Sequence, residues 1–236
     1  MEENSDKTKN IEDNFKYIVT SVLIFVLILT LFNTWQVIGL LNGIKTGTIT
    51  GAATSVSAGI DVIPKGIPEI YGKELSISYD DVSASNQKKA DETIRKLAMY
   101  DINIKLSGDL LKRYINIAGN ISCEYCCGAS AIIFTKDVSK YKAGDAACGC
   151  AHSAAMRGLA KYLLQNHADE YTDEQILEEL GKWKTLFFPD IMAQKAKVLK
   201  DNGIELNYIN LASNKYRGIE YKTLSSSSGN GMIGGC

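Results

Sequence analysis

A long uncharged stretch near the N-terminus restricts how this chain can fold more than any other feature. No charged residue occurs between Lys16 and Lys45, and residues 17–32 include only three polar side chains. Because the hydrocarbon core of a bilayer is about 30 Å thick, a helix needs about 20 residues to cross it. Residues 17–40 are long enough, and Trp35 falls where an interfacial aromatic side chain is expected. This stretch predicts one transmembrane helix, with the lipid bilayer as its partner.

Two other interpretations of this stretch are less favoured. A helix buried in a protein core is rarely apolar on every side over such a length. A cleaved signal peptide needs a site of small residues soon after its apolar part, and the nearest plausible site, residues 56–58, lies well beyond it. We therefore expect an anchor that stays attached.

Lysine and arginine residues beside the apolar stretch predict its orientation. Lys7, Lys9 and Lys16 precede it, whereas Lys45 is the only such residue between the stretch and Lys65. Positive residues are enriched on the cytoplasmic side of membrane proteins. We expect a single-pass protein of the cell membrane, with the C-terminal domain outside.

The rest of the sequence divides by composition. Residues 46–60 are small and uncharged, residues 69–222 carry helical periodicity, and the last residues are rich in serine and glycine. The expected parts are a tail at 1–16, the transmembrane helix at 17–40, a flexible spacer at 41–68, a mainly helical Cys/His domain at 69–222, and a flexible Ser/Gly tail at 223–236.

The predicted fold class is mainly α with minor β. Apolar residues at helical spacing predict helices at about residues 86–100, 111–121, 152–166, 172–187 and 190–202. Thr172 and Gln175 fit a capping box, Pro189 should end the fourth helix, and Gly203 should end the fifth. Alternating runs at residues 75–79, 102–106 and 204–208 suggest short strands.

Composition and motifs exclude several classes of function. The net charge of −1 argues against a nucleic-acid binder, which needs a dense positive patch. The sequence contains no G-x-S-x-G, no phosphate-binding loop and no H-E-x-x-H. An enzymatic role is therefore the less favoured expectation, and no protein partner is indicated.

Five of the six cysteines lie in two short motifs between positions 123 and 150. The first is C-x2-C-C, just past one predicted helix, and the second is C-x-C-x-H, at the start of the next. Zinc takes four thiolate or imidazole ligands in a tetrahedron, and copper(I) also prefers thiolates. The favoured ligands are Cys123, Cys126, Cys148 and Cys150, with His152 or Cys127 as substitutes.

Other roles for these thiols remain open. Cys123 and Cys126 have the spacing of a redox pair, and an extracellular location favours disulfides. The thiols could also be small apolar core residues. A c-type haem is disfavoured, because Cys127 stands where the attachment motif requires histidine.

Four further residues carry weaker expectations. His167 should be an ordinary residue at a helix C-terminus, where the helix dipole favours a cation. Arg157 and Lys161 should lie on a solvated helix face. Cys236 should be incidental, although it could also be a mobile sixth thiol that reaches the cluster.

Two families resemble the motif region. Cys148, Gly149 and Cys150 resemble the end of the Pro-Cys-Tyr-Cys-Gly-Cys motif of extracytoplasmic bacterial proteins, although Ala146 and Ala147 replace its beginning. The following helical stretch is similar to the small thiol-reductase component of cytochrome c maturation, in which a C-x2-C pair precedes a helical hairpin. Cys123 and Cys126 would be that pair. Both resemblances imply a membrane-linked role in handling thiols or metals.

The sequence thus predicts a membrane-anchored, extracytoplasmic metal-binding module. Its site would be structural or metal-handling. The alternatives are a thiol–disulfide oxidoreductase and a disulfide-stapled scaffold or interaction protein.

Overall fold

The computed structural model describes Leu27, residues 60–222 and residues 232–234. The chain divides into two units, residues 1–55 and residues 56–236. The predicted tail at 1–16, the transmembrane helix at 17–40 apart from Leu27, and most of the spacer lie outside the described residues. Among the helices that are described, none has the length and apolar character needed to span a bilayer.

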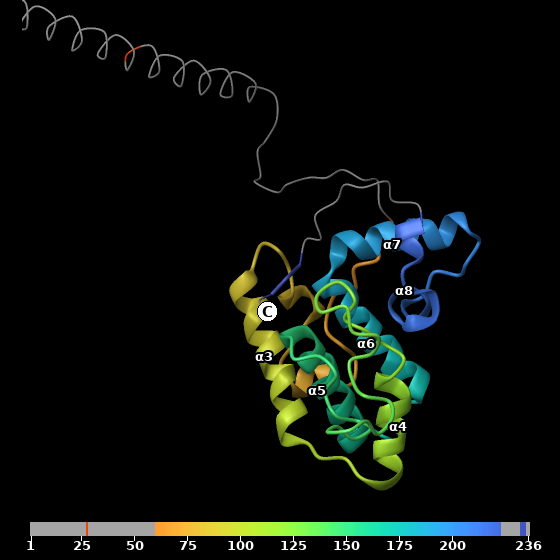
Figure 1. The fold of residues 1–236 in the computed structure, drawn as a ribbon. Coiled ribbons are helices and arrows are strands. Elements are labelled where there is room, and N and C mark those ends of the chain that lie inside the picture. The colour runs from red at the N-terminus through yellow and green to blue at the C-terminus, as the bar shows by residue number, and fades with distance from the viewer. Residues whose placement is uncertain (1–26, 28–59, 223–231, 235–236) are drawn as a thin grey trace, which may run out of the picture. The chain divides into compact units, whose positions relative to one another are not determined.

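The second unit is built from helices, as predicted (Figure 1). Helix α5 lies against α3, α4 and α6, while α6 and α7 both contact α8. Three 3-10 turns, Tyr79–Asp81, Asn214–Tyr216 and Ile219–Lys222, complete the regular structure of the described part. The helices are α2 (Tyr71–Glu74), α3 (Gln87–Asn103), α4 (Gly108–Ala118), α5 (Ala151–Asn166), α6 (Asp173–Phe187), α7 (Pro189–Asp201) and α8 (Tyr208–Ala212).

Local signals explain where α6 and α7 begin and end. The side chains of Thr172 and Gln175 each accept a hydrogen bond from the other residue's backbone N–H, which forms the predicted capping box. Pro189 cannot continue α6, because it has no N–H, but it fits the first turn of α7. Gly203, with φ of +68°, follows the end of α7.

The predicted short strands are wrong, because the described residues contain only isolated β-bridges. Leu75, Ile77 and Tyr79 are buried as their alternation suggested, but the N–H groups of Ile77 and Tyr79 do not bond to a neighbouring strand. The N–H of Ile77 donates to Gly72 and that of Tyr79 to Gly66, both at 2.9 Å. Without a neighbouring strand, an alternating run buries one side without forming a sheet.

The last described residues differ from the expected flexible tail. Ile233 is buried, and its N–H donates to the carbonyl of Phe187 at 2.9 Å. The N–H of Gly234 donates to the side-chain oxygen of Gln87 at 3.1 Å. Residues 223–231 and Cys236 lie outside the described part of the chain.

His167 is more than an ordinary residue at the end of α5. Its ring is buried, with Nδ1 2.7 Å from Glu170 and Nε2 2.9 Å from Glu74. Burial alone would lower the pKa of the imidazole, but the hydrogen bonds to Glu170 and Glu74 outweigh it and the pKa is raised. The folded protein therefore holds this proton more tightly than the unfolded chain does.

This raised pKa predicts a pH-dependent effect of His167→Gln. The stabilisation by protonated His167 should be fully present below its ordinary pKa of about 6.5 and lost as the pH rises through the folded-state pKa. Urea unfolding of both proteins should show a larger loss of stability at pH 5.5 than at pH 9. A difference that stays constant or grows with pH would contradict the ion pairs.

Candidate functional site

The cysteine motifs meet at the N-terminus of α5. Cys123 opens a tight turn, in which its carbonyl accepts hydrogen bonds from the N–H groups of Cys126 and Cys127, both at 3.2 Å. Cys150 caps α5 with an extended backbone, and its sulfur accepts the N–H of Ser153 at 3.4 Å. Two segments that are distant in sequence thus present their thiols to one region, as the sequence predicted.

The sulfur atoms form two groups of three that share Cys150. Those of Cys123, Cys126 and Cys150 lie within 4.8 Å of one another, and so do those of Cys127, Cys148 and Cys150. The sulfurs of Cys123 and Cys150 are 3.4 Å apart. Such a cluster could hold a metal ion or form disulfides.

Cys127 and Cys148 are joined by a disulfide whose Cα atoms are 6.7 Å apart. Cys127 is exposed to solvent, whereas Cys148 is buried. In this state the favoured ligand set is divided: Cys123, Cys126 and Cys150 remain together, and Cys148 is bonded to the substitute ligand Cys127.

Cys150 is placed to be a thiolate. Hydrogen bonds from Cys123, His152 and Ser153, the first being the largest influence, lower the pKa of Cys150 to about 3 against the opposing effect of burial. The N-terminus of α5 also favours negative charge. The same contact with Cys150, together with burial, raises the pKa of Cys123. The contact between the two sulfurs thus favours a thiol at Cys123 and a thiolate at Cys150.

His152 supports this thiolate rather than completing either group of sulfurs. Its ring is buried between Phe187 and Phe188, with centroid distances of 4.8 and 5.2 Å. Nε2 lies 2.8 Å from the carbonyl oxygen of Ile233. Because a carbonyl only accepts, Nε2 carries a hydrogen.

Arg157 holds the second cysteine motif, and the expectation that it is solvated is wrong. Its side chain is buried and donates to the carbonyls of Cys148 at 2.8 Å and Ile132 at 3.2 Å. Asp101 on α3 accepts ion pairs from Arg157 and Lys161, both at 2.7 Å. Helical periodicity alone could not show that α3 covers this face.

A buried ionic network lies beside the first motif and was not foreseen. Glu124 follows Cys123 and contacts Lys184 at 3.2 Å, Arg217 at 3.2 Å and Lys195 at 3.7 Å. Burial alone would raise the pKa of Glu124, but Lys184 and Lys195 outweigh it and the pKa is lowered. Burial lowers the pKa of Lys184 to about 8. The residues of this network are far apart in sequence, so no local sequence pattern predicts it.

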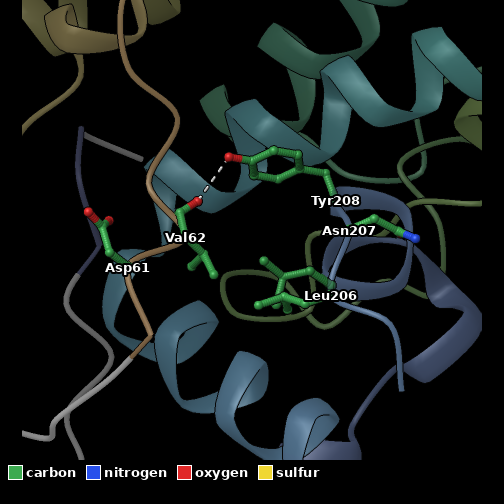
Figure 2. A pocket seen from close by; sticks show the side chains of 6 residues that line it. Asp61, Val62, Leu206, Asn207 and Tyr208 are labelled. Atoms are coloured by element: carbon green, nitrogen blue, oxygen red, sulfur yellow. Dashed lines mark hydrogen bonds between the residues drawn. The ribbon is translucent and has the colours of Figure 1, made fainter. Parts of the chain in front are cut away.

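A small pocket between the chain entering the unit and the start of α8 contains no predicted site residue (Figure 2). It measures about 170 Å³, and the hydroxyl of Tyr208 donates to the carbonyl of Val62 at 3.2 Å across it. Its remaining lining residues are Asp61, Leu206, Asn207 and Leu211. With no cysteine or histidine in its wall, it offers nothing to the chemistry of the cluster.

Comparisons with known proteins add no assignment. No protein-family model, no curated protein and no solved structure matches the chain. The resemblances based on Cys148-Gly149-Cys150 and on Cys123 and Cys126 remain expectations.

Proposed function

We propose that the cluster is a site of thiol–disulfide exchange. The observation that carries this proposal is the position of Cys150: a thiolate-favouring sulfur within 4.8 Å of both sulfurs of the Cys127–Cys148 disulfide. Exchange requires an attacking thiolate, a disulfide within reach and access for the partner. Exposed Cys127 supplies that access.

Two steps follow from this arrangement. In the outer step, a partner thiolate bonds to the sulfur of Cys127, the Cys127–Cys148 bond breaks, and its electron pair leaves on Cys148. A second thiol of the partner then attacks the mixed disulfide and releases Cys127 as a thiolate. In the inner step, Cys150 attacks Cys148 instead, forming Cys148–Cys150 and releasing Cys127. The inner step moves the disulfide without net oxidation.

The proposed location is consistent with this chemistry. We place the domain outside the cell membrane, attached through residues 17–40, on the strength of the uncharged stretch and its flanking lysines. Disulfides persist in such oxidising surroundings. The two family resemblances imply an extracytoplasmic role in handling thiols or metals, which is compatible with this location.

Binding of a soft metal ion is the second candidate. The sulfurs of Cys123, Cys126 and Cys150 lie close enough to share one ion, since Zn–S bonds of about 2.3 Å in a tetrahedron separate the sulfurs by roughly 3.8 Å. Copper(I) is suited to such thiolates. Zinc would need a fourth ligand, and reduction of the disulfide would free Cys148 for that role.

The proposal is tested with the oxidised full-length protein in detergent. One equivalent of a dithiol peptide should be converted to its disulfide, while the protein gains two titratable thiols. Metal content is measured on the same sample. A metal-containing protein that oxidises no peptide would favour the second candidate and reject the first.

A further inference from the structure

We infer that the substrate of this exchange is an extended polypeptide segment that presents a cysteine and binds as an added strand beside the Cys127–Cys148 disulfide. This inference rests on the proposed function and specifies its substrate class. Three features of the chain between the two cysteine motifs carry it: a groove, an open backbone edge, and the unequal exposure of the two bonded sulfurs.

The groove is lined by residues close in sequence to both bonded cysteines and has a volume of about 430 Å³. Ala129, two residues after Cys127, and Ala147, the residue before Cys148, both line it. The other lining residues are mostly small or apolar, and Lys136 is the only charged one. A segment lying in this groove would therefore pass close to the disulfide.

An open strand edge forms one wall of the groove. Ile132 and Phe134 pair with the returning chain: the carbonyl of Ile132 accepts the N–H of Ala147 at 3.2 Å, and the N–H of Phe134 donates to Asp145 at 2.8 Å. The N–H of Ile132 donates to a different segment, at the carbonyl of Ile121, at 3.0 Å. Ile133 bridges to Ala146 in antiparallel fashion. Since backbone groups alternate in direction along a strand, those of the intervening residues face away from this pairing.

The outward-facing backbone groups have no partner within the described part of the chain. Ala131, Ile133 and Thr135 line the groove at every second position, and none of their backbone groups makes a hydrogen bond there. Ala131 and Ile133 are buried. A buried backbone group without a hydrogen-bond partner costs free energy. An extended peptide that adds as a strand would supply the missing partners.

The chemistry selects a polypeptide over a small thiol. Hydrogen bonds along an edge recognise peptide backbone, and small groove residues leave room for alternate side chains of the added strand. Its cysteine must attack Cys127, because Cys148 is buried. The bond then forms between the substrate sulfur and Cys127, while Cys148 leaves as a thiolate.

The test compares two reductants of the full-length protein in detergent: a ten-residue peptide with one central cysteine, and dithiothreitol. Ala129→Trp fills the groove, and Ala84→Trp, at an exposed position outside it, is the matched control. A second peptide carries N-methyl groups on alternate backbone amides and keeps its thiol. The peptide reaction is followed by mass as the mixed disulfide forms, and the dithiothreitol reaction by the two free protein thiols that it produces.

Ala129→Trp should slow the reaction with the peptide at least tenfold and leave the rate with dithiothreitol within twofold. N-methylation should slow the wild-type reaction similarly, with no change to the protein and hence no question of folding. The inference is overturned, while exchange stands, if neither change slows the reaction with the peptide. It is also overturned if Ala129→Trp slows the reactions with the peptide and with dithiothreitol equally. If neither reagent reacts with the disulfide at all, the proposed function itself has failed.

Discussion

Cys150→Ser should remove most of the alkylation of the protein by iodoacetamide at pH 5. Cys150 has a pKa of about 3, whereas burial and the contact with Cys150 raise the pKa of Cys123. An ordinary thiol, with a pKa of about 8.5, is less than about 0.1% ionised at this pH. Thiolates of low pKa are weaker nucleophiles, which offsets about two to three of the roughly three and a half powers of ten in ionisation, so Cys150 should still react about tenfold faster than an ordinary thiol.

The same substitution should also stop the inner transfer of the disulfide. A serine hydroxyl stays protonated near neutral pH and cannot attack Cys148, so digestion and mass analysis should find no Cys148–Cys150 linkage in the variant. Cys126→Ser is the matched control, because it removes a neighbouring thiol and leaves Cys150 in place. If rapid alkylation at pH 5 persists in Cys150→Ser and disappears in Cys126→Ser, the thiolate is Cys126 and its assignment to Cys150 is wrong.

The convergence of the two cysteine motifs could be predicted, but the pairing of their sulfurs could not. Both motifs adjoin helix ends, and this places them near one another. The pairing depends on the intervening chain, in which Ile132 and Phe134 join residues 144–147 and so set the direction of Cys148. That chain carries no periodic pattern, so its path follows from tertiary contacts.

In the fold, too, features set by neighbouring residues could be predicted, whereas features set by tertiary contacts could not. The capping box at Thr172 and the break at Pro189 act within one turn of the chain, and the sequence located both. Burial of Arg157, by contrast, depends on Asp101 of α3, and burial of Lys184 depends on Glu124. Charged residues that find partners elsewhere in the chain look like surface residues in the sequence alone.

Gly158→Ala should cause a large loss of stability, because the backbone of α3 lies directly against α5 at this position. A Cβ at Gly158 would lie 1.9 Å from the carbonyl oxygen of Leu97 and 2.9 Å from the backbone nitrogen of Asp101. Both atoms belong to the backbone of α3, so no side chain can move aside to relieve the clash. Helices α3 and α5 would have to separate along their shared contact.

We expect the loss to be about 3 kcal/mol or more, since overpacking typically costs about 1–3 kcal/mol even where side chains can adjust. At about 2–4 °C per kcal/mol for a domain of this size, Tm should fall by roughly 10 °C. Gly149→Ala is the matched control, because its added Cβ would meet nothing within 4 Å. It should change stability by less than about 0.5 kcal/mol.

The effect should extend to the cysteine cluster, because α3 supplies Asp101, the partner of Arg157, and Arg157 holds the carbonyl of Cys148. Below the melting temperature of Gly158→Ala, dithiothreitol should therefore reduce the Cys127–Cys148 disulfide faster in this variant than in the wild-type protein. Equal melting temperatures for Gly158→Ala and Gly149→Ala would show that α3 and α5 are not in backbone contact. The position of Arg157 would then need another cause, because α3 would no longer be held against it.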